Sequence, residues 1–245
     1  MMTHRYQLLS GVTAVLLFIA IASSVISTVG AESSPAEIRN TLLRLNDQAI
    51  HDHVNIAINW LGNALIIMLG AFWFLRFKDE GIVNVTLASI AMCFGGLLLA
   101  AAQLPHLGAG ALAAEYGATG SSADESVAAA ARALLIMSSF GVALSMSLIA
   151  IATLLYSEVF LRTRAVPKPI AVIGLIAGPT TLVSYWLPRL FPVLWLFFKW
   201  LQIPLLLFLL AIGIWMVRAA MKDRDQGPVG LRSGATLAAD EPVSF

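Results

Sequence analysis

Six long apolar runs, separated by polar segments, dominate the hydrophobicity pattern of the chain. A helix needs about 20 mostly apolar residues to cross the hydrocarbon core of a bilayer. This length predicts transmembrane helices over residues 8–30, 54–75, 82–104, 133–157, 170–187 and 199–217. We therefore expect an all-α fold, a polytopic membrane protein whose six-transmembrane-helix bundle forms a single domain over residues 1–222.

The first run follows His4 and Arg5 and therefore resembles a secretory signal. It is longer than the 7–15 apolar residues of a typical signal, which favours a retained helix. The small-residue segment at 27–31 could still act as a cleavage site. Cleavage would leave five spans and the same cytoplasmic C-terminus.

The polar segments predict the remaining elements. Pro35 lies near an expected first turn, and we expect an amphipathic helix over residues 36–50 on the outer membrane surface. Residues 105–127 are rich in Gly, Ala and Ser and predict a loop. Pro188 to Pro192 predicts a break, followed by an interfacial segment at 193–198. The tail at 223–245 is expected to be a disordered cytoplasmic segment.

The distribution of basic residues predicts the orientation, because Lys and Arg are enriched in cytoplasmic loops. With the N-terminus inside, ten of the 15 basic residues are cytoplasmic and five lie outside or near the outer interface. The segment at 105–127 has none. The sequence therefore predicts an N-in/C-in topology.

The second span carries the clearest polar pattern. His51, Asn55, Asn59 and Asn63 recur every four residues, so each is rotated by only about 40° from the one before. Polar side chains are costly in a bilayer, and this face is expected to point into the bundle. Two interpretations stay open: hydrogen bonds between helices, or an outer-facing polar pocket that binds a small molecule or lipid.

Polar residues of other spans are expected at the same outer level. Tyr185 in the fifth span and Gln202 early in the sixth complete the candidate ligand-binding set. Serine and threonine also occur there, at positions 138, 139, 145, 147, 180, 181 and 184. These small residues equally fit a role in helix packing.

The histidines suggest a metal or haem site. His51 and His53 form an H-x-H pair, and His106 is expected on the same outer side. Zinc sites usually use three or four protein ligands, whereas His51 and His53 point about 200° apart on one helix. These three residues are weak metal candidates, and we predict neither a bound metal nor a cofactor.

Catalytic motifs are absent from the sequence. It contains no G-x-S-x-G, Walker A or glycine-rich dinucleotide motif. This favours a non-enzymatic protein, and no catalytic residue is assigned.

Motifs in the second half resemble those of bacterial six-span proteins grouped as domain of unknown function 4386. They are Leu154-Leu155-Tyr156-Ser157, Val166-Pro167-Lys168, the helix Ile173 to Gly178, and Pro204 followed by Gly213-Ile214-Trp215. The resemblance covers Gln7 to about Lys222 and implies a six-span fold without a known activity. Members often carry a glutamate shortly after the proline, where this chain has Leu and Phe around Phe208.

We therefore expect a multi-pass protein of the bacterial cytoplasmic (inner) membrane that binds or transports a small molecule or lipid, or acts as an accessory protein. The alternatives are a metal- or haem-dependent membrane enzyme that uses the outer histidines, and a structural subunit of a larger membrane complex. Expected partners are the lipid bilayer, a small-molecule or lipid ligand and other membrane subunits. The 15 basic and 14 acidic residues nearly balance, which does not suggest a nucleic-acid partner.

Overall fold

The computed structural model describes residues 2–27, 35–47, 49–119, 124–191 and 200–225. These ranges contain helices and short links and no strand, which confirms the all-α class. The helices are α1 (Met2–Ser27), α2 (Pro35–Asp47), α3 (Ala49–Phe77), α4 (Ile82–Thr119), α5 (Asp124–Thr163), α6 (Lys168–Leu190) and α8 (Ile203–Asp225), and the 3-10 helix η1 (Lys78–Glu80) links α3 to α4.

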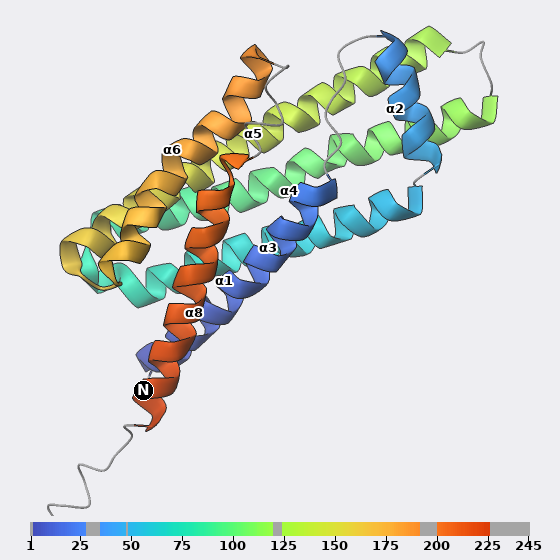
Figure 1. Cartoon of the computed structure of the whole chain (residues 1–245). Coiled ribbons are helices and arrows are strands. Elements are labelled where there is room, and N and C mark those ends of the chain that lie inside the picture. The colour runs from blue at the N-terminus through green and yellow to red at the C-terminus, as the bar shows by residue number, and fades with distance from the viewer. Residues whose placement is uncertain (1, 28–34, 48, 120–123, 192–199, 226–245) are drawn as a thin grey trace, which may run out of the picture.

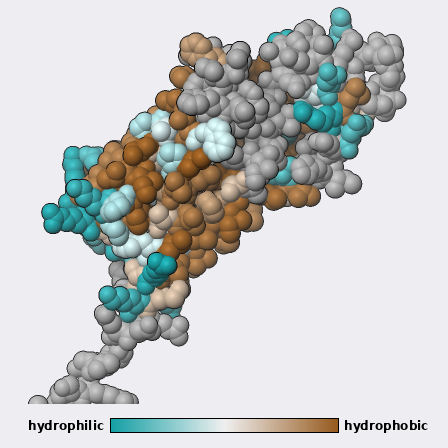
Figure 2. All heavy atoms as spheres, viewed as in Figure 1, coloured by the Kyte–Doolittle hydropathy of each residue, from teal (hydrophilic) through white to brown (hydrophobic). Residues whose placement is uncertain are grey.

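Six of the described helices, all except α2 and η1, are long and apolar enough to cross a membrane. The face drawn in Figure 2 carries a broad hydrophobic surface over the middle of the bundle, with hydrophilic residues toward its ends. A surface of this kind matches the hydrocarbon core and the two polar margins of a bilayer. The prediction of a six-span, multi-pass membrane protein is confirmed.

The six spanning helices form a closed ring. Each packs mainly on two neighbours, in the order α1, α3, α4, α5, α6, α8 and back to α1. Consequently α3 and α6 lie across the ring from each other. We call the end where α1 begins and α8 ends the terminal end, and the end where α2 lies the capped end (Figure 1).

Glycines allow the closest contacts around α6. Gly174 lies against Ser157 and Phe208, and Gly178 lies against Leu154, so a β-carbon at either position would overlap these neighbours. This G-x-x-x-G pair therefore lies at a close helix crossing, as small residues at such spacing allow.

Aromatic side chains fill the interior of the ring toward the terminal end. Trp73 of α3 is fully buried and makes edge-on contacts with Tyr156, Phe160 and Phe208, with ring centroids 4.7, 5.9 and 6.0 Å away. Tight packing joins helices in a membrane, and such aromatic pairs contribute about 0.5–1.5 kcal/mol each beyond area burial. This aromatic cluster ties α3, α5 and α8 together.

The prediction of a loop over residues 105–127 is wrong. α4 continues through Pro105 to Thr119, and α5 begins at Asp124. The segment is rich in alanine, which has the highest helix propensity of all residues. Proline removes the backbone hydrogen bond to the carbonyl of Ala101, and the rest of the long helix tolerates this single loss.

α2 is the amphipathic helix expected over residues 36–50, although it ends at Asp47 and α3 begins at Ala49. Leu42 and Leu45 pack with Ala113 of α4 and with Ala128 and Ala131 of α5. This small core is separate from the core of the ring. α2 is therefore held against the protruding ends of α4 and α5 by its apolar face.

Two other helix boundaries differ from those expected from the sequence. The sixth span begins at Ile203 rather than Lys199, because Pro204 suits a first helical turn, where a missing N–H is not needed. α6 continues through Pro188 and ends at Leu190, within the expected break. The interfacial segment at 193–198, residues 28–30 and the tail from 226 onward lie outside the described residues.

Candidate functional site

A pocket of about 280 Å³ lies at the capped end, between α2, α3 and α4. This volume is close to the lower limit for small-molecule sites in proteins. The described residues that line it are Leu45 and Asn46 of α2, His53 and Ile56 of α3, and His106, Leu107, Gly110, Ala111 and Ala114 of α4.

The wall supplied by α4 follows from its helical spacing. Positions 106, 110 and 114 are each four residues apart and therefore share one face of the helix. The last of these, Ala114, and Ala111 beside it have short side chains that leave room in front of the backbone. A β-carbon at Gly110 would meet nothing within 4 Å. The pocket exists because this stretch is both helical and poor in bulky residues.

The part of the pocket formed by α2 depends on the small second core. Leu45 belongs to that core and also lines the pocket. Asn46, the next residue, lines the pocket with its amide side chain and is otherwise exposed. Docking of α2 on the alanines of α4 and α5 therefore completes the pocket.

The pocket has few polar side chains, and each of them can both donate and accept a hydrogen bond. His53 is exposed, His106 is half-buried, and both line the same pocket although 53 positions separate them in the chain. Neutral imidazole carries one donor and one acceptor, and the Asn46 amide carries both as well. The pocket therefore combines two imidazoles and one amide with walls that are otherwise apolar.

A metal centre receives no support from this geometry. Among the described residues no three His, Cys, Asp or Glu side chains gather in a way that could hold a metal ion. The pocket brings together His53 and His106, which are two of the three weak candidates. The side chain of the third, His51, lies outside the described residues.

The asparagine face of α3 is separate from this pocket. Asn55 and Asn59 are half-buried, and Asn63 is only 2% exposed. The Nδ2 atom of Asn63 has no hydrogen-bond partner among the described residues. The structure therefore does not place these asparagines and the pocket histidines in one site.

Tyr185 and Gln202 also lie away from the pocket. Tyr185 is half-buried on α6, across the ring from α3. Gln202 precedes α8, and its backbone carbonyl accepts hydrogen bonds from the N–H groups of Leu205 and Leu206 at 3.1 and 3.2 Å. That carbonyl begins the hydrogen-bond ladder of the last helix.

Two further polar contacts link α4 to α5. The hydroxyls of Ser89 and Tyr156 lie 2.5 Å apart inside the ring, and Ser89 also donates to the carbonyl of Val85 at 2.7 Å. Sequence reasoning missed this pair, since a serine and a tyrosine 67 residues apart carry no local signal. The pair fixes the position of Tyr156 beside Trp73.

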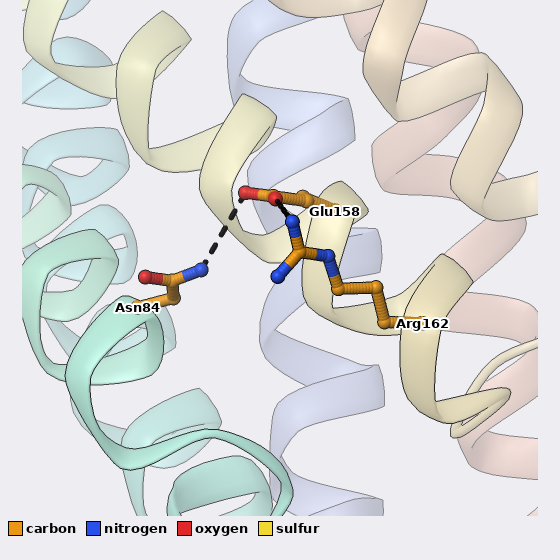
Figure 3. Close-up of polar contacts among 3 residues, drawn as sticks. All are labelled: Asn84, Glu158 and Arg162. Carbon is orange, nitrogen blue, oxygen red and sulfur yellow. Dashed lines mark hydrogen bonds and ion pairs between the residues drawn. The ribbon is translucent and has the colours of Figure 1, made fainter.

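At the terminal end, the Nδ2 of Asn84 donates to Oε2 of Glu158 at 3.5 Å (Figure 3). Glu158 also forms an ion pair with Arg162, which lies four residues later on α5. The two charged side chains are 39% and 71% exposed, so solvent screening leaves the pair worth only a few tenths of a kcal/mol. This contact is a surface link and is remote from the pocket.

The fold defines a six-span helical membrane protein with a pocket at one end of its bundle. The chain belongs to the family described as domain of unknown function (DUF4386), whose model matches residues 9–219. The resemblance found in the sequence motifs is thus confirmed. No curated protein and no solved structure matches the chain.

Proposed function

We propose that this protein binds a small amphiphilic molecule in the pocket between α2, α3 and α4. The observation that carries the proposal is the meeting of His53, His106 and Asn46 on otherwise apolar walls. Small-molecule sites commonly combine apolar lining with a few polar groups that orient the ligand. The fitting ligand has a short apolar body and a head that both accepts and donates hydrogen bonds.

The place of the pocket suits an amphiphile. On α3 and α4 the pocket lies at the capped-end limits of the apolar spans, which run over His53–Glu80 and Ile82–Glu115. Amphiphilic groups concentrate at such membrane–water boundaries. A ligand at this level can arrive laterally from the bilayer or from the aqueous side.

We further propose that both termini lie in the cytoplasm, so that the pocket faces the opposite side of a bacterial inner membrane. The ends of helices at the terminal end carry Arg5, Arg76, Lys78, Arg162 and Lys168, as the positive-inside rule requires. A C-terminal reporter that folds only outside the cytoplasm should stay inactive. Activity of that reporter would overturn the orientation.

The binding proposal is tested with a pocket-filling substitution, Gly110→Leu. The new side chain has open space before it and would occupy the volume that the ligand needs. Ala101→Leu is the matched control, since Ala101 is an exposed residue of the same helix outside the pocket. Both proteins are purified from native membranes, and co-purified small molecules are quantified by mass spectrometry after denaturation.

The wild type and Ala101→Leu should retain the same amphiphile in comparable amounts. Gly110→Leu should retain about tenfold less or lower, which corresponds to about 1.4 kcal/mol of lost binding. Equal retention by all three proteins, or no bound amphiphile in the wild type, would overturn the proposal. His106→Ala tests the polar group separately, because it removes a hydrogen-bonding head contact while enlarging the pocket.

A further inference from the structure

The asparagine face of α3 points into the ring rather than toward the pocket. At 100° per residue, Asn55, Asn59 and Asn63 fall within about 80° of Ile66 and Trp73. Trp73 contacts aromatic rings of α5 and α8, so this face is directed at the interior. The interior side of α3 is thus polar toward the capped end and aromatic toward the terminal end.

Asn63 is the deepest polar residue on this face. It is 2% exposed, and its Nδ2 has no hydrogen-bond partner among the described residues. Its backbone carbonyl lies at the level of Gly96, where a β-carbon would approach it to 3.1 Å. The adjacent Gly95 accepts a hydrogen bond at 2.6 Å from Ser145 of α5. Asn63, Gly95 and Ser145 therefore share one level of the ring.

Thr181 of α6 is the matching group on the opposite wall. It is fully buried, and its Oγ1 has no partner among the described residues. Gly178 lies against the carbonyl of Ala150, and Trp186 donates to Ser147 at 2.8 Å. Thr181 lies between those two contacts, which places it within about one helical turn of the level of Ser145.

Two buried polar groups that lack partners among the described residues thus lie at one level, on walls that face each other. A third, the indole N–H of Trp73, is buried nearer the terminal end and also has no partner in the part of the chain that the structure describes. Buried polar groups of native proteins are nearly always paired, and ordered water supplies the partner where protein does not. In a bilayer an unpaired polar group costs more free energy, because the surrounding lipid offers no hydrogen bond.

We propose that the capped half of the ring interior is a hydrated chamber for water and small uncharged hydrogen-bonding solutes. Asn55 and Asn59 line the approach from the capped end. Asn63 and Thr181 hold the innermost solvent from opposite walls. The aromatic cluster of Trp73, Tyr156, Phe160 and Phe208 closes the chamber toward the terminal end. This chamber is distinct from the amphiphile pocket, and neither proposal depends on the other.

The test measures the reactivity of single cysteines in sealed membranes. Cys93→Ala removes the native thiol, and cysteines are then introduced by Asn59→Cys, Asn63→Cys and Thr181→Cys. Leu61→Cys is the control on the same helix, since Leu61 is 61% exposed on the outside of the bundle. The probe is 2-sulfonatoethyl methanethiosulfonate, a charged reagent that reacts with the thiolate, which a lipid-embedded thiol does not form readily.

All three interior cysteines should react faster than Leu61→Cys, by roughly tenfold or more, and only with reagent on the capped side. Reaction at Asn59→Cys alone would overturn the proposal, because solvent would then stop short of the buried pair. If Asn63→Cys fails to fold, Thr181→Cys reports on the same level from the other wall.

Thr181→Val gives a second and independent readout. If water bonds the hydroxyl, its isosteric removal should lower the melting temperature. If the site is dry, loss of an unpaired buried hydroxyl should leave the melting temperature unchanged or raise it, and that result would also overturn the proposal.

Discussion

Gly174 offers the sharpest test of how the ring is packed. A β-carbon there would overlap the Ser157 hydroxyl and lie 2.6 and 2.9 Å from two ring carbons of Phe208. Carbon atoms pack best at about 3.5–4.0 Å, so both neighbours must move. Phe208 is fully buried against Trp73 and has little freedom to do so. We therefore expect Gly174→Ala to destabilise the protein.

The expected loss of folding free energy in Gly174→Ala combines three contributions. Overpacking of a close-packed interior costs about 1–3 kcal/mol. Displacing the Ser157 hydroxyl disrupts its 2.7 Å hydrogen bond to the carbonyl of Thr153, which is worth about 1 kcal/mol. Alanine regains up to about 1 kcal/mol over glycine in helix propensity. The net loss is about 1–3 kcal/mol, which lowers the melting temperature by roughly 2–12 °C for a chain of this size.

The assay is thermal unfolding in detergent followed by intrinsic tryptophan fluorescence. Gly110→Ala is the matched control, because the same substitution in α4 meets nothing within 4 Å and should leave the melting temperature unchanged or slightly higher. Adding Ser157→Ala to Gly174→Ala should recover part of the loss. If Gly174→Ala melts at or above the wild-type temperature, or if Ser157→Ala gives no recovery, the packing argument is refuted.

Three further substitutions separate the parts of the fold. Tyr156→Phe removes the hydroxyl shared with Ser89 and should cost about 1 kcal/mol, a melting shift of a few degrees; an unchanged melting temperature would show that this bond contributes nothing. Leu42→Ala should cost about 2–5 kcal/mol within the small second core, so hydrogen exchange should accelerate in α2 alone, and equal acceleration in the ring would contradict two separate cores. Glu158→Gln should change stability by less than about 1 kcal/mol, because the ion pair is exposed; a larger loss would reveal coupling between α4 and α5 through Asn84.

The number of spans was predictable from sequence because the bilayer imposes a length on every crossing helix. The ring order was not predictable in the same way. Gly174 and Gly178 indicate a close crossing, yet nothing local shows that their neighbours are α5 and α8. Such partners depend on how several helix faces fit together, and that information is spread over the whole chain.

The pocket illustrates the same limit. His53 and His106 were recognisable as candidates, but their meeting requires α4 to remain helical beyond Pro105 and α2 to dock on alanines. The loop prediction gave more weight to the proline and glycines of residues 105–127, which disfavour a helix, than to the alanines, which favour one. The alanines at 109, 111, 113 and 114 were the signal that favoured a helix, because alanine has the highest helix propensity.

Pro105 also divides α4 mechanically. The segment before it belongs to the ring, whereas the segment after it carries His106, Gly110 and the rest of the pocket wall. Since no N–H at this position restrains the carbonyl of Ala101, the helix bends here more easily than at any fully bonded turn. Because Leu42 and Leu45 of α2 pack on Ala113, a bend at Pro105 moves the outer arm of α4 together with α2. The distance between the pocket walls of α4 and α3 therefore depends on the bend of one helix at one residue.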